Sequence, residues 1–301
     1  MRWQVGALFA VCLDACGPRA ARPEEPPRYV GRREHGAQAA PVGAAATSAP
    51  LRIATWNVLR LGHGSSKRLD VVAQVIEHNF DVAALQEVMT REGVDALLAQ
   101  LPGWAAVVSD RAVGRSSYKE LYAVLYRAQL AQALESWQDP DAHDAFEREP
   151  FVACLRAGKF DFCVVSIHVV YGDDAAARSL ECAALGTLVG GWRDNRAEKD
   201  WIVVGDFNLS GSDSCWSGFL QGGWRHTMDG MIPTSLGTGA YKSAYDHVLV
   251  APAFTGEWAG EGRRVDTVTE VCGGDFARCR KEVSDHAPVV ATFRTEGPDD
   301  D

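Results

Sequence analysis

The sequence predicts an α/β fold in which mixed β-sheets are covered by helices. Short apolar runs of strand length recur along the chain, and some are separated by segments whose apolar residues have helical spacing. Because crossover helices join some of these strands and hairpins join others, we expect parallel and antiparallel pairs within one domain. An apolar content of 47% is sufficient for a sizeable core.

The expected elements follow one another without a fixed internal repeat. Strands are expected at residues 51–58, 81–88, 105–109, 121–126, 151–155, 160–168, 201–204, 245–250 and 287–292. Helices are expected at residues 69–79, 93–101 and 175–192. This order of strands and helices indicates a single mixed-sheet domain over residues 50–295.

The first 16 residues predict an export signal. Arg2 gives a positive start, and residues 5–13 form an apolar run that is too short to span a bilayer. The sequence Leu13-Asp14-Ala15-Cys16 resembles a bacterial lipobox, although Asp14 is unusual there. Two alternatives remain open: a protein anchored to the bacterial cell envelope by lipid on Cys16, or a plainly secreted protein.

Composition separates the ends of the chain from its centre. Residues 17–49 are rich in Ala, Pro, Arg and Gly, which predicts a disordered linker, and residues 296–301 form an acidic tail. The formal net charge is -10, so no basic field draws nucleic acid from a distance. This disfavours a passive DNA-binding module more than an enzyme that neutralises phosphates with a metal ion and a few local cations.

Six cysteines remain beyond the export signal, and an even number in an exported chain predicts disulfides. The expected pairs are Cys272–Cys279, Cys154–Cys163 and Cys182–Cys215. The first pair brackets a glycine-rich loop, the second faces across a predicted hairpin, and the third is left by elimination. None of the spacings resembles a zinc site.

Residues 201–210, WIVVGDFNLS, hold the strongest local signal. Their first four residues are typical of a strand buried on both faces, and Gly205 allows a turn or a close approach. Asp206 and Asn208 follow, and in an extended segment their side chains would point the same way. A carboxylate and an amide at a strand end suit a metal or phosphate site. The ordinary alternative is an Asx turn that caps the strand.

The same arrangement recurs at other strand ends. The polar residues found there are Asn57, Glu87, His168, Asp206, Asn208, Asp246, Asp285 and His286. Ligands bind at strand ends in open sheets, so we expect these side chains to converge. Glu87, with Asn57 and Asp285, offers the sparse oxygen set typical of Mg²⁺, the alternative for Glu87 being a surface salt bridge. Two histidines held by carboxylates suit proton transfer at the two ends of a phosphodiester.

Four motifs resemble those of the endonuclease/exonuclease/phosphatase superfamily: GDFN, SDHAPV, an early strand ending in WN and a strand ending in QE. The match covers residues 51–293, and GRSSYKE (114–120), FEREP (146–150) and Ala244-Tyr245-Asp246 are similar to the deoxyribonuclease I branch. The resemblance implies a four-layer α/β sandwich, in which two packed mixed β-sheets are flanked by helices. It also implies a metal-dependent phosphodiesterase, most specifically a DNA endonuclease.

The resemblance also implies two proton-transfer pairs. Glu120 would hold His168, which would act at the leaving oxygen. Asp246 would hold His286, which would activate the attacking water.

The remaining roles implied by the resemblance concern the phosphate and the metal. The residues implied for the phosphate are Asp206, Asn208, Tyr118 and Arg148. Glu87 would be the main ligand of Mg²⁺ or Mn²⁺, with Asn57 and Asp285 beside it, and Ca²⁺ would be a structural ion. The expected partner is nucleic acid, specifically DNA, and the expected state is a monomer.

Two departures from the family concern DNA binding. Leu59 and Met89 stand where the family's eukaryotic enzymes place arginines that enter the minor groove, although Arg60 and Arg91 lie close by in the sequence. Duplex DNA is therefore a weaker expectation than phosphodiester hydrolysis. The alternatives are a sphingomyelinase- or inositol-phosphate-type hydrolase on the same fold, and an inactive surface binding module.

Overall fold

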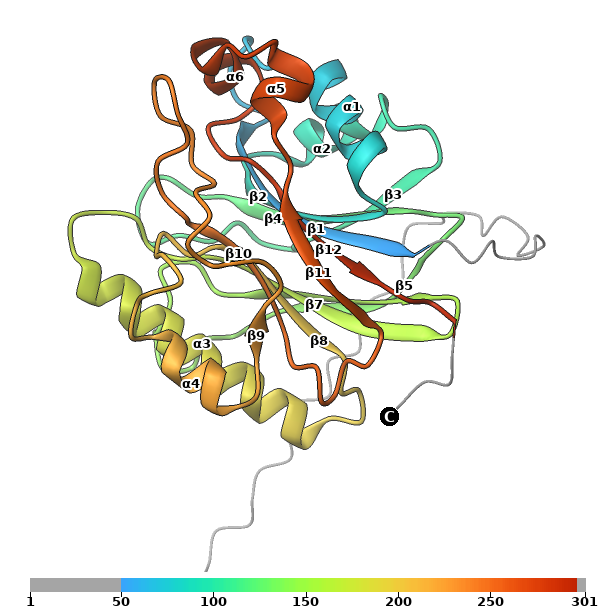
Figure 1. The fold of residues 1–301 in the computed structure, drawn as a ribbon, viewed down its shortest axis with the longest axis vertical. Coiled ribbons are helices and arrows are strands. Elements are labelled where there is room, and N and C mark those ends of the chain that lie inside the picture. The colour runs from blue at the N-terminus through green and yellow to red at the C-terminus, as the bar shows by residue number, and fades with distance from the viewer. Residues whose placement is uncertain (1–49, 297–301) are drawn as a thin grey trace, which may run out of the picture. The chain divides into compact units, whose positions relative to one another are not determined.

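The computed structural model describes residues 50–296, and its strands form two six-stranded sheets with helices on both outer faces (Figure 1). This confirms the predicted fold class of two packed mixed sheets flanked by helices. The expected export signal, the lipobox, the linker and residues 297–301 of the acidic tail lie outside the described residues.

The first sheet has the strand order β11-β12-β1-β2-β4-β3. Its strands are β1 (Leu51–Leu61), β2 (Val82–Val88), β3 (Trp104–Val108), β4 (Leu121–Arg127), β11 (Trp258–Arg264) and β12 (Val289–Phe293). The second sheet has the order β5-β6-β7-β8-β10-β9. Its strands are β5 (Gln132–Gln138), β6 (Phe151–Ala157), β7 (Phe160–His168), β8 (Trp201–Asp206), β9 (Arg225–His226) and β10 (Asp246–Val250). In each sheet the central pair, β1–β2 or β7–β8, is parallel and the other pairs are antiparallel.

Helices cover the outer face of each sheet (Figure 1). The helices on the first sheet are α1 (Leu69–Asn79), α2 (Arg91–Leu98), α5 (Thr267–Cys272) and α6 (Phe276–Glu282). The helices on the second sheet are α3 (Ala175–Asn195) and α4 (Trp216–Gln221). None of the helices within residues 50–296 is long and apolar enough to cross a membrane.

Several element boundaries differ from the sequence prediction. Helix α2 begins at Arg91 and ends at Leu98, whereas residues 93–101 were expected, because the Thr90 hydroxyl caps the helix by accepting from the Gly93 N–H at 3.1 Å. Strands β5 and β11 were not predicted. Both are edge strands with largely exposed residues, so neither shows the apolar alternation that marks a half-buried strand. The short elements β9, α4, α5 and α6 were missed as well.

Three layers of apolar packing hold the sandwich together. The central layer lies between the two sheets and contains Ile53, Val124, Phe162 and Val204, each fully buried. The outer layers pack the helices onto the sheets. Because β8 faces the central layer on one side and α3 on the other, its run WIVV has no polar position, as its sequence predicts.

The three expected disulfides are all present. Cys154 and Cys163 are direct partners in the antiparallel register of β6 and β7. Cys182 joins α3 to Cys215, which immediately precedes α4. The third bridge links α5 to α6.

Candidate active site

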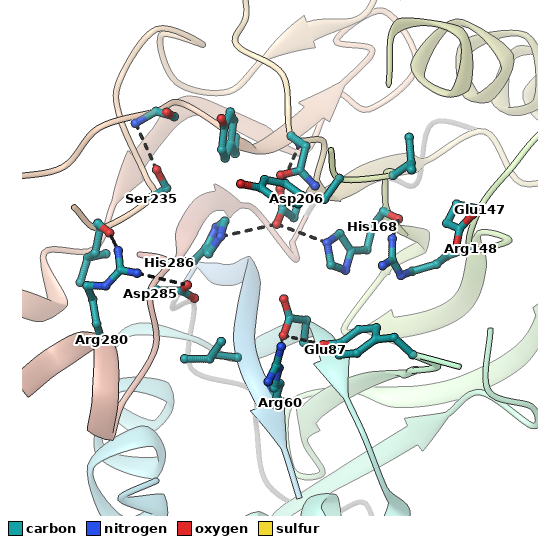
Figure 2. Close-up of a pocket in the computed structure, with 18 of the residues that line it drawn as sticks. Arg60, Glu87, Glu147, Arg148, His168, Asp206, Ser235, Arg280, Asp285 and His286 are labelled. Carbon is teal, nitrogen blue, oxygen red and sulfur yellow. Dashed lines mark hydrogen bonds and ion pairs between the residues drawn. The ribbon is translucent and has the colours of Figure 1, made fainter. Parts of the chain in front are cut away.

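The predicted site residues meet at one end of the two sheets, around a cavity of about 700 Å³ (Figure 2). Those lining the cavity are Glu87, Tyr118, Arg148, His168, Asp206, Asn208, Asp285 and His286. The other three, Asn57, Glu120 and Asp246, are buried behind this lining and hydrogen-bond to it. The structure therefore brings together every residue that the sequence selected.

Strand register explains much of this convergence. Asp206 is paired with His168 across the parallel strands β7 and β8, and with Asp246 across the antiparallel strands β8 and β10. Gly205 makes the pairing possible: its φ is 153°, and a Cβ there would overlap the carbonyl oxygen of Ile167. The close approach predicted at this glycine is confirmed.

The first proton-transfer pair bridges the two sheets. Nδ1 of His168 lies 2.8 Å from Oε1 of Glu120, which immediately precedes β4 in the opposite sheet. The other carboxylate oxygen of Glu120 lies 3.3 Å from Nε of Arg148. Burial would lower the pKa of His168, but the Glu120 and Asp206 carboxylates together outweigh it, and the pKa is raised.

The second pair bridges the sheets in the other direction. Nδ1 of His286, shortly before β12, lies 2.8 Å from Oδ2 of Asp246 at the start of β10. The main-chain oxygen of His286 accepts from the Trp56 indole N–H at 2.9 Å, which fixes the segment. Burial opposes protonation of His286, yet the Asp246 and Asp206 carboxylates raise its pKa well above the usual value.

Asp206 lies between the two histidines, as Figure 2 shows. Its Oδ2 is 3.6 Å from Nε2 of His168 and 3.6 Å from Nε2 of His286, and it accepts from the Asn57 side-chain amide at 3.0 Å. The two 3.6 Å separations are too long for hydrogen bonds, so both Nε2 atoms can still exchange a proton with a substrate. Burial and the nearby Asp246 raise the pKa of Asp206.

Asn208 corrects one expectation. Its φ of 52° is left-handed, so the segment is not extended there and the alternation of side chains along a strand does not explain how Asp206 and Asn208 both reach the cavity. The Asp206 carboxylate accepts from the Asn208 main-chain N–H at 3.0 Å, and the Asn208 amide donates to the Val169 carbonyl at 3.0 Å. The Asx turn considered as an alternative is therefore present, and it places Asn208 in the cavity wall.

Glu87 has the environment of an ionised carboxylate. Oε1 accepts from the Asn57 amide at 3.1 Å, and Oε2 accepts from the Tyr118 hydroxyl at 2.8 Å and the Arg60 main-chain N–H at 3.2 Å. Burial would raise its pKa, but the charge of His168 and the hydrogen bonds from Asn57 and Tyr118 lower it.

The residues present fit a small hard cation. Glu87 and Asp285 line the same cavity, and the buried Oδ1 of Asp285 has no hydrogen-bond partner within residues 50–296. Asn57 turns its amide nitrogen toward Glu87 and Asp206, while its oxygen accepts from the Leu59 N–H at 3.0 Å. In this geometry Asn57 orients Glu87, and its service as a metal ligand stays a prediction.

A second group of candidate ligand atoms lies opposite. Asp206, Asp246 and His286 each offer one atom, and these atoms lie within 4.8 Å of one another. The hydrogen bond between His286 and Asp246 already uses Nδ1 of the histidine and Oδ2 of the carboxylate, so protonation of the pair and metal binding would compete there.

Of the two arginines that the sequence placed near the family positions, one lies on the rim. Arg60 lines the cavity, Leu59 and Arg60 both adopt left-handed backbone, and the Arg60 guanidinium lies 5.5 Å from the centre of the Tyr118 ring. Arg91, the other arginine near a family position, instead donates to the Ser109 carbonyl at 2.7 Å and does not line the cavity. Two further cations complete the rim: Lys242, from the loop before β10, and Arg280, from helix α6.

The family follows from this geometry together with the matched sequence. Residues 54–286 match the family described as Endonuclease/Exonuclease/phosphatase family. The chain belongs to this family. It is accordingly a hydrolase that acts on phosphodiester bonds.

Similar proteins are consistent with this placement. The chain is 33% identical over 262 residues to a protein named Deoxyribonuclease from Thioalkalivibrio sp. (strain K90mix), covering 82% of this chain and 72% of that protein. It is 27% identical over 267 residues to human Deoxyribonuclease-1, covering 81% of this chain and 92% of that protein. Among solved structures, TDP2 of D. rerio, in complex with a single-strand DNA product, shares the fold with a TM-score of 0.59 and 17% identity, over 82% of this chain and 99% of that one.

Proposed function

We propose that this protein is a divalent-metal-dependent endonuclease that hydrolyses DNA. One observation carries the proposal: two histidine–carboxylate pairs face a common Asp206 from opposite sides of a cavity. Such a pair of proton-transfer groups suits in-line displacement at phosphorus, where one end needs a base and the other an acid. The names of the two deoxyribonuclease relatives support DNA as the substrate.

In the proposed reaction, water attacks phosphorus and transfers a proton to Nε2 of His286, which acts in its neutral form although the neighbouring carboxylates raise its pKa. The bond between phosphorus and the leaving oxygen breaks on the opposite side, and that oxygen takes a proton from Nε2 of His168. The cross-sheet carboxylates Asp246 and Glu120 hold each ring by Nδ1, so Nε2 is the nitrogen presented to the substrate.

Charge that develops on the phosphoryl oxygens needs donors nearby. Arg148 and Asn208 line the cavity on the His168 side, and the Arg148 guanidinium lies 6.0 Å from the centre of the Tyr118 ring. A Mg²⁺ or Mn²⁺ ion held by Glu87 and Asp285 would supply further positive charge to the phosphate. The ionised state of Glu87 suits that role.

A polymeric substrate is favoured by what surrounds the cavity. A second hollow of about 600 Å³ adjoins it, and the two share Asn208, Lys242, Ser243 and Tyr245. The binding surface therefore continues beyond one phosphate, whereas a sphingomyelin or inositol-phosphate headgroup would need only the first cavity. The cations Arg60 and Arg280 on the rim suit a polyanion.

The setting of the enzyme is also a proposal. Three disulfides favour an oxidising compartment, which supports export as a secreted protein or as one anchored through lipid on Cys16. We expect the protein to act as a monomer, with Ca²⁺ as an additional structural ion.

Plasmid nicking tests the proposal directly. The protein, with its disulfides formed, is incubated with supercoiled plasmid in Mg²⁺, in Mn²⁺ and in EDTA, beside His168→Ala as a control. We expect nicked and then linear plasmid with either metal ion and none in EDTA. Intact plasmid from folded protein would contradict the DNA assignment, and hydrolysis of sphingomyelin or inositol phosphates would then identify the alternative. Plasmid binding without cleavage would favour the inactive binding module.

A further inference from the structure

Glu181 is a buried carboxylate that the proposed reaction does not use. It lies in α3 and is 6% exposed. Its Oε1 accepts from the main-chain N–H of Glu147 at 2.9 Å, and its Oε2 accepts from the main-chain N–H of Val170 at 3.1 Å. One carboxylate group therefore holds two loops that are distant in sequence.

Each of the two loops contains or adjoins a residue of the site. Glu147 immediately precedes Arg148, and Val170 lies two residues after His168. These two site residues also meet each other, because the Arg148 guanidinium donates to the main-chain oxygen of His168 at 3.4 Å. Glu181 thus fixes, from behind, both members of the half of the site that faces the leaving oxygen.

We propose that Glu181 is a positioning residue that sets His168 and Arg148 relative to each other. The proposal rests on the function proposed above. An ionised acceptor forms stronger hydrogen bonds than a neutral one, and both carboxylate oxygens are engaged, so no other side chain of similar size replaces it. The role is distinct from capping α3, because Asp174 is the N-cap residue and accepts from the Ala176 and Ala177 N–H groups.

Glutamine at position 181 separates the two contacts. Glu181→Gln preserves the size of the side chain, but its amide has one oxygen and one NH₂ group. One of the two main-chain N–H groups would then face a donor and lose its acceptor. The loop that loses its acceptor should shift together with the site residue in it or next to it, and a displacement of about 1 Å at a catalytic group costs on the order of 10²-fold in rate.

The test compares two leaving groups. The 3′ or 5′ oxygen of DNA needs a proton to depart, whereas p-nitrophenolate is a weak base and departs without one. We expect Glu181→Gln to lower kcat on DNA by about 10²-fold, the cost of a misplaced catalytic group, and to lower kcat on bis(p-nitrophenyl) phosphate several-fold less. Equal losses on both substrates would reduce Glu181 to a general structural role, and unchanged kcat on DNA would overturn the proposal.

Asp81→Asn is the matched control. Asp81 is a buried carboxylate that accepts from Arg52 and Arg127, and it precedes β2 at the opposite end from Glu87. Its loss should lower stability while kcat on both substrates stays at the wild-type value. If the ratio of kcat on DNA to kcat on the ester changed in this variant, that ratio would report on stability and not on the position of His168.

Hydrogen exchange decides the matter independently of activity. The main-chain amides of Glu147 and Val170 should exchange faster in Glu181→Gln than in wild type, and at the wild-type rate in Asp81→Asn. Unchanged exchange at both amides would overturn the proposal. If the wild-type enzyme cleaves neither DNA nor the ester, the proposed function fails while these exchange rates still decide whether Glu181 positions the two loops.

Discussion

The two histidine–carboxylate pairs have the same hydrogen-bond geometry and different electrostatic surroundings. In each pair Nδ1 lies 2.8 Å from a carboxylate oxygen, and in each Nε2 lies 3.6 Å from Asp206. Arg148 shares Glu120 with His168 and opposes the rise in the pKa of that histidine. By contrast, Oδ1 of Asp246 has no hydrogen-bond partner in the described part of the chain, and the pKa of His286 is raised well above normal.

One sandwich supplies both proton-transfer sites in the same way. Both pairs connect residues of opposite sheets, so the packing of the sheets sets both distances. The two pairs differ in the third group beside each carboxylate, and that group determines how strongly the pKa of the histidine is raised. The packing of the two sheets thus sets the geometry of both pairs, and residues of the neighbouring loops adjust the pKa of each histidine.

Removal of either ring should have the largest effect. We expect His168→Ala and His286→Ala each to lower kcat on DNA by about 10²–10⁴-fold, the usual contribution of a general acid or base. The two variants should differ in their dependence on the leaving group. On bis(p-nitrophenyl) phosphate, kcat of His168→Ala should approach the wild-type value for that substrate, whereas kcat of His286→Ala should stay low. Steady-state kinetics on both substrates measure this, and the reverse pattern would exchange the two assignments.

Removal of the carboxylate charge should have the next largest effect on kcat. The two pairs should differ in KM, which should rise only when Glu120 is changed. Asp246→Asn should lower kcat about 10²-fold or more, because the neutral amide neither fixes the required tautomer of the ring nor stabilises its protonated form, with KM near the wild-type value. Glu120→Gln should lower kcat similarly and also raise KM, because Arg148 loses its anionic partner. Kinetics at several DNA concentrations test this, and identical KM values for the two variants would show that Arg148 is held without Glu120.

The pH dependence of stability should reveal that the pKa of His286 is raised more than the pKa of His168. The folded-state pKa values of both histidines are raised above 6.5, so their protonated forms stabilise the fold below pH 6.5, and this stabilisation is lost as pH rises through the folded-state values. In EDTA, His286→Ala should therefore remove more of this pH-dependent stabilisation than His168→Ala. Denaturant unfolding from pH 5 to 9 measures it, and equal slopes for the two variants would show that Arg148 has little influence.

Parts of the site were predictable from the sequence because their environment leaves a pattern. His168 and Asp206 end long apolar runs, and the register of β7 and β8 places the two residues side by side. Rim residues such as Lys242 come from loops without periodicity, so no pattern marks them. Glu181 was hidden for another reason: a glutamate within a helix is ordinarily solvated, and its burial depends on two loops that fold over α3.

The rim should affect binding more than chemistry, which gives the smallest expected effect. Leu59 lines the cavity with a φ of 47°, so Leu59→Arg adds a cation without a new backbone strain. We expect KM for DNA to fall several-fold and the dependence of binding on log[salt] to steepen by about 1, with kcat unchanged. Met89→Arg is the control, since Met89 does not line the cavity. A change in kcat for Leu59→Arg would mean that the rim also orients the phosphate between the two histidines, and the separation of binding from chemistry would fail.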